Sequence, residues 1–128
     1  MAGTTTHPVA FRNTVADLVD STLSTTAKLV FRTTGNAGTP GSEVATLAMS
    51  NPAFGAADAG VITASAITSD TDATGGTIAT ATLQTGAGTV IVHTTVGTSG
   101  DAINMSGGLV VGAGDTVACS SLTYEAMP

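Results

Sequence analysis

Apolar residues recur at helical spacing near the start of the chain. A first helical turn suits Pro8, and the residues that follow at this spacing are Phe11, Val15, Leu18, Val19 and Thr22. Polar residues fall on the other side, namely Arg12, Asn13, Asp17 and Asp20. The pattern predicts one amphipathic helix over about residues 9–22, with its apolar stripe packed on a sheet rather than offered to a partner.

From residue 27 onward the apolar period changes to two. Leu29 and Phe31 point one way while Lys28 and Arg32 flank Val30 on the other side, which predicts a half-buried strand. In the fourth predicted strand, Ala79, Ala81 and Leu83 likewise alternate with Thr80, Thr82 and Gln84. The predicted strands cover residues 28–32, 43–49, 61–68, 77–85, 89–96, 102–105, 108–111 and 116–124.

Turn signals separate these strands at residues 35–41, 51–52, 75–76, 86–88, 97–101 and 112–115. No second helix fits between the strands, which excludes a parallel α/β fold. The fold class predicted is mainly β, an antiparallel β-sandwich or jelly roll of about eight strands with one N-terminal amphipathic helix. Residues 1–8 are expected to form a flexible N-terminal tail, and residues 9–128 a single β-sandwich domain.

Composition supports a folded chain with a thin core. The 128 residues include no tryptophan, one tyrosine and three phenylalanines, whereas 25 are threonines, whose branched β-carbon suits a pleated strand. Only 9% of residues are charged, which argues against disorder. The length is that of one domain.

The charge pattern excludes two classes of partner. Nine acids stand against Arg12, Lys28 and Arg32, giving a net charge of −6, so direct nucleic-acid binding is not expected. No apolar run approaches the length that spans a bilayer, and no basic segment followed by an apolar one opens the chain. We therefore expect neither a membrane span nor a secretion signal.

The glycine-rich stretch Gly112–Thr116 raises the possibility of a phosphate-binding loop. A dinucleotide fingerprint needs a helix after its last glycine, but here Gly114 is followed by Asp115 and a predicted strand. A Walker loop needs a lysine, and the single lysine of the chain, Lys28, lies in a strand. The stretch is predicted to be a turn, with Asp115 capping its own bend.

Residues 69–75 have acids two apart, Asp70 and Asp72, and a glycine at the sixth position, as in a calcium loop. The twelfth position, where a bidentate glutamate belongs, is Ala81. The sequence leaves a bound cation open and favours a solvated hairpin tip.

Other reactive side chains form no recognisable constellation. Ser99 lacks a nucleophile elbow, and His93 is expected to face solvent from a strand, so a triad is not predicted. Two histidines and one cysteine, widely separated, make a poor zinc site, and Cys119 is expected to be a small buried filler. We predict no catalytic, cofactor-binding or metal-binding residues, no cofactor, and a chain that is not an enzyme.

A series of short strings gives the chain a family resemblance. In order, they are residues 44–47, 51–57, 60–61, 66–70, 96–101, 113–117 and 121–124, which read VATL, NPAFGAA, GV, AITSD, VGTSGD, AGDTV and SLTY. This series, with a short helix before Lys28-Leu29, resembles a group of small Ala/Thr/Gly-rich virion proteins of tailed bacteriophages and prophages. The resemblance extends over nearly the whole chain.

The resemblance implies a capsid decoration (cement) protein on the outer surface of the phage head, assembled in the host cytoplasm. Its partners would be the major capsid protein, whose subunit contacts it would stabilise, and other copies of itself, a trimer being favoured. A tail or head-to-tail component remains an alternative. Scarce aromatic residues weigh against a receptor- or glycan-binding module, and an enzyme is the least favoured class.

Two segments are predicted to contact the capsid. One is the N-terminal tail, with Thr4, Thr5, Thr6 and His7, and the other is the glycine-rich loop 35–42, with Asn36, Thr39 and Pro40. The tail has no apolar period of its own and the loop is long and glycine-rich, so each could order on binding, with plain disorder or solvent exposure as the alternative.

Overall fold

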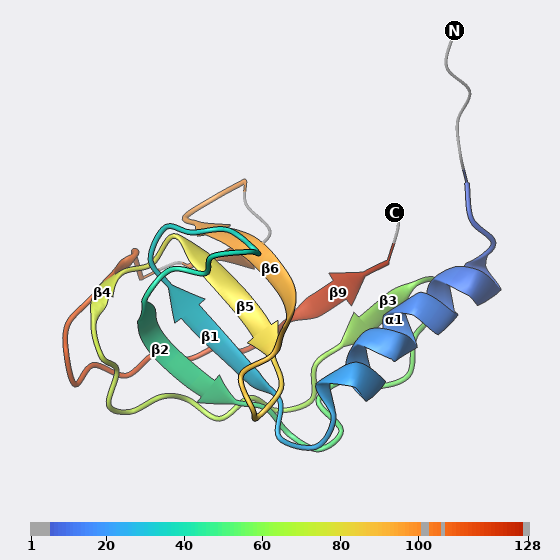
Figure 1. Ribbon diagram of the computed structural model, residues 1–128, viewed down its shortest axis with the longest axis horizontal. Coiled ribbons are helices and arrows are strands. Elements are labelled where there is room, and N and C mark those ends of the chain that lie inside the picture. Colours follow the sequence, from blue (N-terminus) through green and yellow to red (C-terminus); the bar gives the residue numbers. More distant parts are fainter. Residues whose placement is uncertain (1–5, 101–102, 106, 127–128) are drawn as a thin grey trace, which may run out of the picture.

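The structure is a computed structural model that describes residues 6–100, 103–105 and 107–126 (Figure 1). One helix is followed by short strands. The elements are α1 (Val9–Leu23), β1 (Lys28–Arg32), β2 (Glu43–Ala48), β3 (Val61–Thr63), β4 (Gly76–Thr77), β5 (Thr80–Gln84), β6 (Val90–Gly97), β7 (Ile103–Asn104), β8 (Val110–Val111) and β9 (Thr123–Glu125). The predicted mainly β class with one N-terminal helix is confirmed.

The strands form one five-stranded sheet, in the order β2-β1-β5-β6-β7, and two ribbons, β3-β9 and β4-β8. Every pair is antiparallel except β6-β7, where Val96 and Gly97 pair with a parallel strand, contrary to the prediction. The sheets do not close on one another.

Several predicted strands are shorter in the structure. The strand expected at 77–85 divides at Ile78 and Ala79, because their amides donate to Leu109 and Arg32 rather than to one continuous neighbour. The strand expected at 116–124 is irregular until Thr123, and the one expected at 61–68 ends at Thr63.

The inner face of the five-stranded sheet carries the core. Leu29 and Phe31 of β1 alternate as predicted, and register places Leu47 beside Leu29 on β2 and Leu83 beside it on β5. The residues of this cluster that are fully buried include Leu23, Leu29, Phe31, Val44, Leu47, Phe54, Ile62 and Ile78. Burial of each such side chain contributes about 2 kcal/mol to stability.

The outer face of the same sheet is also covered at its centre, so the half-buried strand predicted at 28–32 is wrong at Val30. Val30 is 1% exposed and Thr82, its partner on β5, is 0% exposed. The Arg32 side chain lies across them: Nε donates to Thr82 Oγ1 at 3.1 Å, Nη2 to Gln84 Oε1 at 2.9 Å and Nη1 to the Gly41 carbonyl at 2.9 Å. One guanidinium thus closes the outer face and ties it to the loop after β1.

That loop, residues 33–42, is fixed by its own contacts. A Cβ at Gly41 would overlap the Thr33 carbonyl, so only glycine lets the two ends of the loop approach this closely. At the tip, Asn36 and Thr39 exchange backbone hydrogen bonds of 3.1 and 3.2 Å, and Asn36 Oδ1 accepts the Gly38 and Thr39 amides. These contacts hold the tip of the loop from within, and its ordering on binding stays a prediction.

Helix α1 packs through its polar side against the segment that precedes β3. Asn13 Oδ1 accepts the Gly60 amide at 2.7 Å, Asp17 Oδ1 accepts the Ala57 amide at 2.9 Å, and Asp20 Oδ1 accepts the Phe54 amide at 3.0 Å. Arg12 adds hydrogen bonds to the Ala126 carbonyl and to Glu125, both of 3.0 Å. Ala16, Val19 and Leu23 complete the buried side.

The prediction that the apolar stripe packs on a sheet is therefore wrong for most of the stripe. Phe11 and Leu18 are 49% and 59% exposed, and Thr22 is exposed as well. Only Val19 is buried and Val15 half-buried. The helix is turned because the backbone amides between Phe54 and Gly60 need acceptors, and the polar side of the helix supplies them.

We expect Arg32→Met to lower the free energy of unfolding by about 2–3 kcal/mol, because it leaves acceptors on Thr82, Gln84 and Gly41 without their donor. Urea denaturation measures this change. Lys28→Met is the matched control: it removes the same charge from the same face of β1, where Lys28 makes no side-chain hydrogen bond within the described ranges. It should change stability by less than about 0.5 kcal/mol. Equal losses for both variants would contradict the role assigned to Arg32.

Candidate interaction surface

The most exposed large apolar side chains of α1 form one candidate surface. Phe11 and Leu18 are seven residues apart and so lie on the same side of the helix, and Val9, at its first turn, is 52% exposed. The His7 ring stacks on Phe11 with centroids 5.6 Å apart. We call Phe11 and Leu18 the exposed helix face, because Val9 lies two residues before Phe11 and therefore on the opposite side of the helix. Sequence periodicity identifies these residues but assigns them to the wrong side of the helix.

The residues predicted to contact the capsid do not form one patch. Thr6 and His7 are exposed beside the exposed helix face, and Thr4 and Thr5 lie outside the described residues. The loop residues Asn36 and Thr39 are exposed and Pro40 is half-buried. Figure 1 shows this loop over the five-stranded sheet and α1 beyond β3, at the other end of the molecule.

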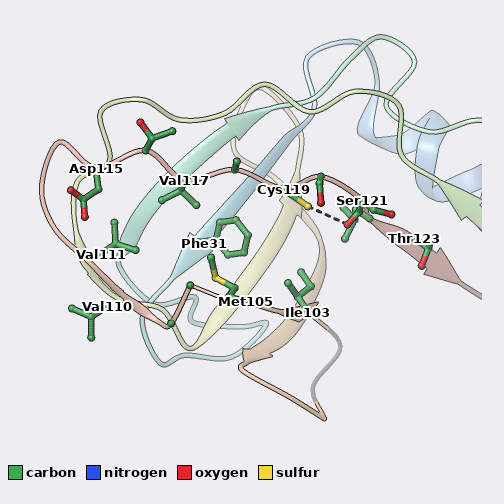
Figure 2. A pocket seen from close by; sticks show the side chains of 16 residues that line it. Phe31, Ile103, Met105, Val110, Val111, Asp115, Val117, Cys119, Ser121 and Thr123 are labelled. Carbon is green, nitrogen blue, oxygen red and sulfur yellow. Dashed lines mark hydrogen bonds between the residues drawn. The ribbon is translucent and has the colours of Figure 1, made fainter.

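A groove of about 520 Å³ lies between the inner face of the sheet and the C-terminal segment (Figure 2). Phe31 comes from the sheet, Ile103 and Met105 from the stretch around β7, and Val117 and Cys119 from the segment that leads to β9. Sequence reasoning missed this groove because fifteen of its sixteen lining residues fall within 103–123, a stretch without a continuous strand period, and the last, Phe31, comes from β1.

Cys119 is the one cysteine of the chain and lines this groove. It is half-buried, packs against the core and donates its thiol hydrogen to the Ser121 carbonyl at 3.3 Å. Burial raises the pKa of the Cys119 thiol, since desolvation disfavours the thiolate. The thiol thus fills space, as expected, although it is not fully buried.

The acidic loop at residues 69–75 is not the solvated hairpin tip expected from sequence. Asp70 is half-buried, and its carboxylate accepts the Thr46 amide at 2.8 Å and the Asp72 amide at 2.9 Å. Oδ2 therefore joins the loop to β2, while Oδ1 holds the turn of the loop itself. Within the described ranges, no group of three or more His, Cys, Asp or Glu side chains converges as a metal site would require.

The Gly112–Asp115 stretch is a turn, as predicted. The Asp115 amide donates to the Gly112 carbonyl at 3.0 Å, and Asp115 Oδ2 accepts the Gly112 amide at 2.8 Å. Gly114 has a φ of 86°, which favours glycine. No helix follows this turn, so its amides are not arranged as a phosphate site.

The structure does not join Ser99 to His93. Ser99 is exposed in the loop after β6, and no hydrogen bond between the two side chains is present in the described part of the chain. His93 is half-buried on β6 rather than solvent-facing, and its Nε2 atom is buried without a hydrogen-bond partner among the described residues. Of the helices described, none is long and apolar enough to cross a membrane.

Comparison with protein-family models, with curated proteins and with solved structures finds no match to this chain. The function is therefore argued from the geometry above and from the resemblance in sequence.

The raised pKa of Cys119 predicts slow alkylation. At pH 8 the folded protein should react with iodoacetamide more slowly than the chain unfolded in guanidinium, and its rate should rise at higher pH than that of the unfolded chain. Because the pKa of the Cys119 thiol is higher in the folded chain than in the unfolded chain, the free energy of unfolding should also fall as the pH rises past the ordinary cysteine pKa. Intact-mass spectrometry over a pH series checks the rates, and a folded chain that reacts as fast as the unfolded one would contradict this assignment.

Proposed function

We propose that this protein is a bacteriophage capsid decoration protein, which binds the outer surface of the head and stabilises contacts between major capsid subunits. The observation that carries the proposal is the exposed helix face. The polar side of α1 is engaged with the protein's own backbone, so Phe11 and Leu18 are left for a partner. Large apolar residues exposed together on a soluble domain are typical of protein-binding surfaces.

The size of this face fits a repeated contact better than a single strong one. Phe11 and Leu18 are each only about half exposed, so they supply a small part of the roughly 800 Å² per partner of a stable interface. On a symmetric shell many copies bind at once, and self-association makes release require several contacts to break together. A trimer, as the resemblance implies, would provide this.

The architecture belongs to the same proposal. We take the five-stranded sheet as one layer of a sandwich, and the ribbons β3-β9 and β4-β8 with the coil between them as a reduced second layer.

The loop 33–42 supports a contact role in a different way from the helix. Its exposed tip at Asn36 and Thr39 is held by internal hydrogen bonds, so binding through it would lose little conformational freedom.

A protein inventory of purified phage particles tests the proposed location. We expect copy numbers comparable to those of the major capsid protein, measured by quantitative mass spectrometry, with density for this chain on the outside of the head. A handful of copies would favour the tail or head-to-tail alternative. Absence from particles would overturn the proposal.

The double variant Phe11→Ser, Leu18→Ser tests the contact itself. We expect it to fold, since both side chains are exposed, and to bind heads stripped of the protein at least about tenfold more weakly, because 1.4 kcal/mol of lost apolar contact corresponds to a factor of ten. Val110→Ser is the matched control: it removes an exposed apolar side chain from β8, away from α1, and should bind as the parent does. Equal binding by all three proteins would exclude the exposed helix face.

A further inference from the structure

The outer edge of β6 is an unpaired strand edge. The Val96 amide donates to the Ala79 carbonyl at 3.0 Å. In an antiparallel ladder this bond makes Thr95 and His93 non-hydrogen-bonded partners of the β5 residues opposite them, Thr80 and Thr82. The amide and carbonyl groups of Thr95 and His93 consequently point away from β5. On that side β7 pairs in parallel with Val96 and Gly97, a pairing that also engages the Thr95 carbonyl, so the edge from Val90 to Thr94 has no strand partner among the described residues.

Strand β9 has a second such edge. The Ala64 amide donates to the Leu122 carbonyl at 2.8 Å and the Ala126 amide to the Gly60 carbonyl at 2.9 Å, so the backbone groups of Thr123 and Glu125 point away from β3. Within the described ranges, these groups have no backbone partner either.

An apolar cavity of about 330 Å³ lies between these two edges. Leu83 and Val92 line it from the five-stranded sheet, and Leu122 and Tyr124 line it from the β9 segment. Extended peptides bind such sites by pairing their main chain with the strand edge, while alternate side chains enter a pocket beside it. An unpaired edge next to an apolar pocket has the two features that this mode of binding requires.

We propose that this site binds residues 2–7 of a second copy of the chain as an added strand on β6. The inference deepens the self-association included in the proposed function, and it is tested without any phage particle. Charge favours this occupant: the three longest acid-free stretches of the chain are residues 1–16, 21–42 and 73–100, and the second and third contain strands of the body itself. Residues 2–7 therefore bring no carboxylate to the acidic body of another copy.

The composition of the segment suits a strand that ends at Pro8. Residues 4–6 are threonines, which favour extended strands, and Pro8 has no amide to donate, so pairing stops before the helix. Six extended residues span about 20 Å, enough to run along residues 90–95.

The described end of this segment points away from the β6 edge of its own copy. Thr6–Pro8 lead away from the body at the end of α1 that is farther from β6 (Figure 1), and Pro8 is extended, with φ −58° and ψ 149°. The strand is therefore donated to a neighbouring molecule, and the resulting head-to-tail contact can close a ring such as a trimer.

Light scattering of the purified chain tests this inference. We expect an oligomer, whereas deletion of residues 2–7 and the variant Thr95→Pro should both give the monomer mass of about 12 kDa. Proline at this position removes an outward amide and no hydrogen bond to β5. Thr95→Ala is the matched control, which keeps the amide and should remain oligomeric. Circular dichroism and melting temperature should show that all variants fold.

A mixing experiment identifies donor and acceptor. The deleted chain keeps an open β6 edge and the Thr95→Pro chain keeps its donor segment, so an equimolar mixture should form a heterodimer that neither forms alone. A parent chain that is monomeric, oligomers that persist in either variant, or a mixture that stays monomeric would each overturn the inference. Any of these results leaves binding to particles through the exposed helix face to be judged by its own assay, so the two proposals fail separately.

Discussion

The backbone amides between Phe54 and Gly60 need hydrogen-bond acceptors, and helix α1 supplies them from its polar side. Asn13, Asp17 and Asp20 each accept one of these amides, which fixes the rotation of the helix about its axis. The amides of Phe54 and Gly60 are bonded in part-buried positions, where an unsatisfied amide costs about 1–3 kcal/mol, whereas the Ala57 amide is bonded at an exposed position and contributes less. The two part-buried bonds are comparable to the gain from burying one or two large apolar side chains, and Phe11 and Leu18 remain exposed.

Hydrogen bonds also take the place of apolar packing on the outer face of the five-stranded sheet. Strand β5 has threonine and glutamine on its outer face, and a chain with so few large side chains has little apolar material to cover them. Arg32 covers them instead, using one planar group with several donors to satisfy Thr82, Gln84 and the Gly41 carbonyl. The centre of the sheet is thereby closed on both sides, while the β6 edge from Val90 to Thr94 has no strand partner within the described part of the chain.

These two features explain what the sequence could and could not predict. The period of two located β1 and β2 almost to the residue, and the helical period located α1, because local spacing records which positions share a side. The spacing could not tell which side of α1 packs, since that depended on amides some forty residues away. It also could not show that Val30 is buried, because its cover is Arg32 and a loop.

The candidate sites were likewise predictable where their contacts are local in sequence and not predictable where they are long-range. The turn at Gly112–Asp115 was predictable because its capping carboxylate lies three residues from the amide it accepts. The carboxylate of Asp70 was misjudged because one of its donors, Thr46, lies 24 residues earlier, so an apparent solvated tip is in fact a joint between a loop and β2. The groove and the cavity beside β9 are assembled from four or more separate segments, and no local pattern marks them.

The net negative charge of the chain affects both the exposed helix face and the β6 edge. A net charge of −6 makes copies of this chain repel one another, which keeps exposed apolar groups and strand edges from uncontrolled aggregation. Contact is then favoured where the approaching segment lacks acids, and of the three longest acid-free stretches two, 21–42 and 73–100, contain strands of the body. The remaining one, residues 1–16, includes Phe11 of the exposed helix face and the proposed donor strand before it, while Leu18 lies just beyond it. On the two proposals above, this stretch would contribute both to the contact with a neighbouring copy and to the contact with a shell.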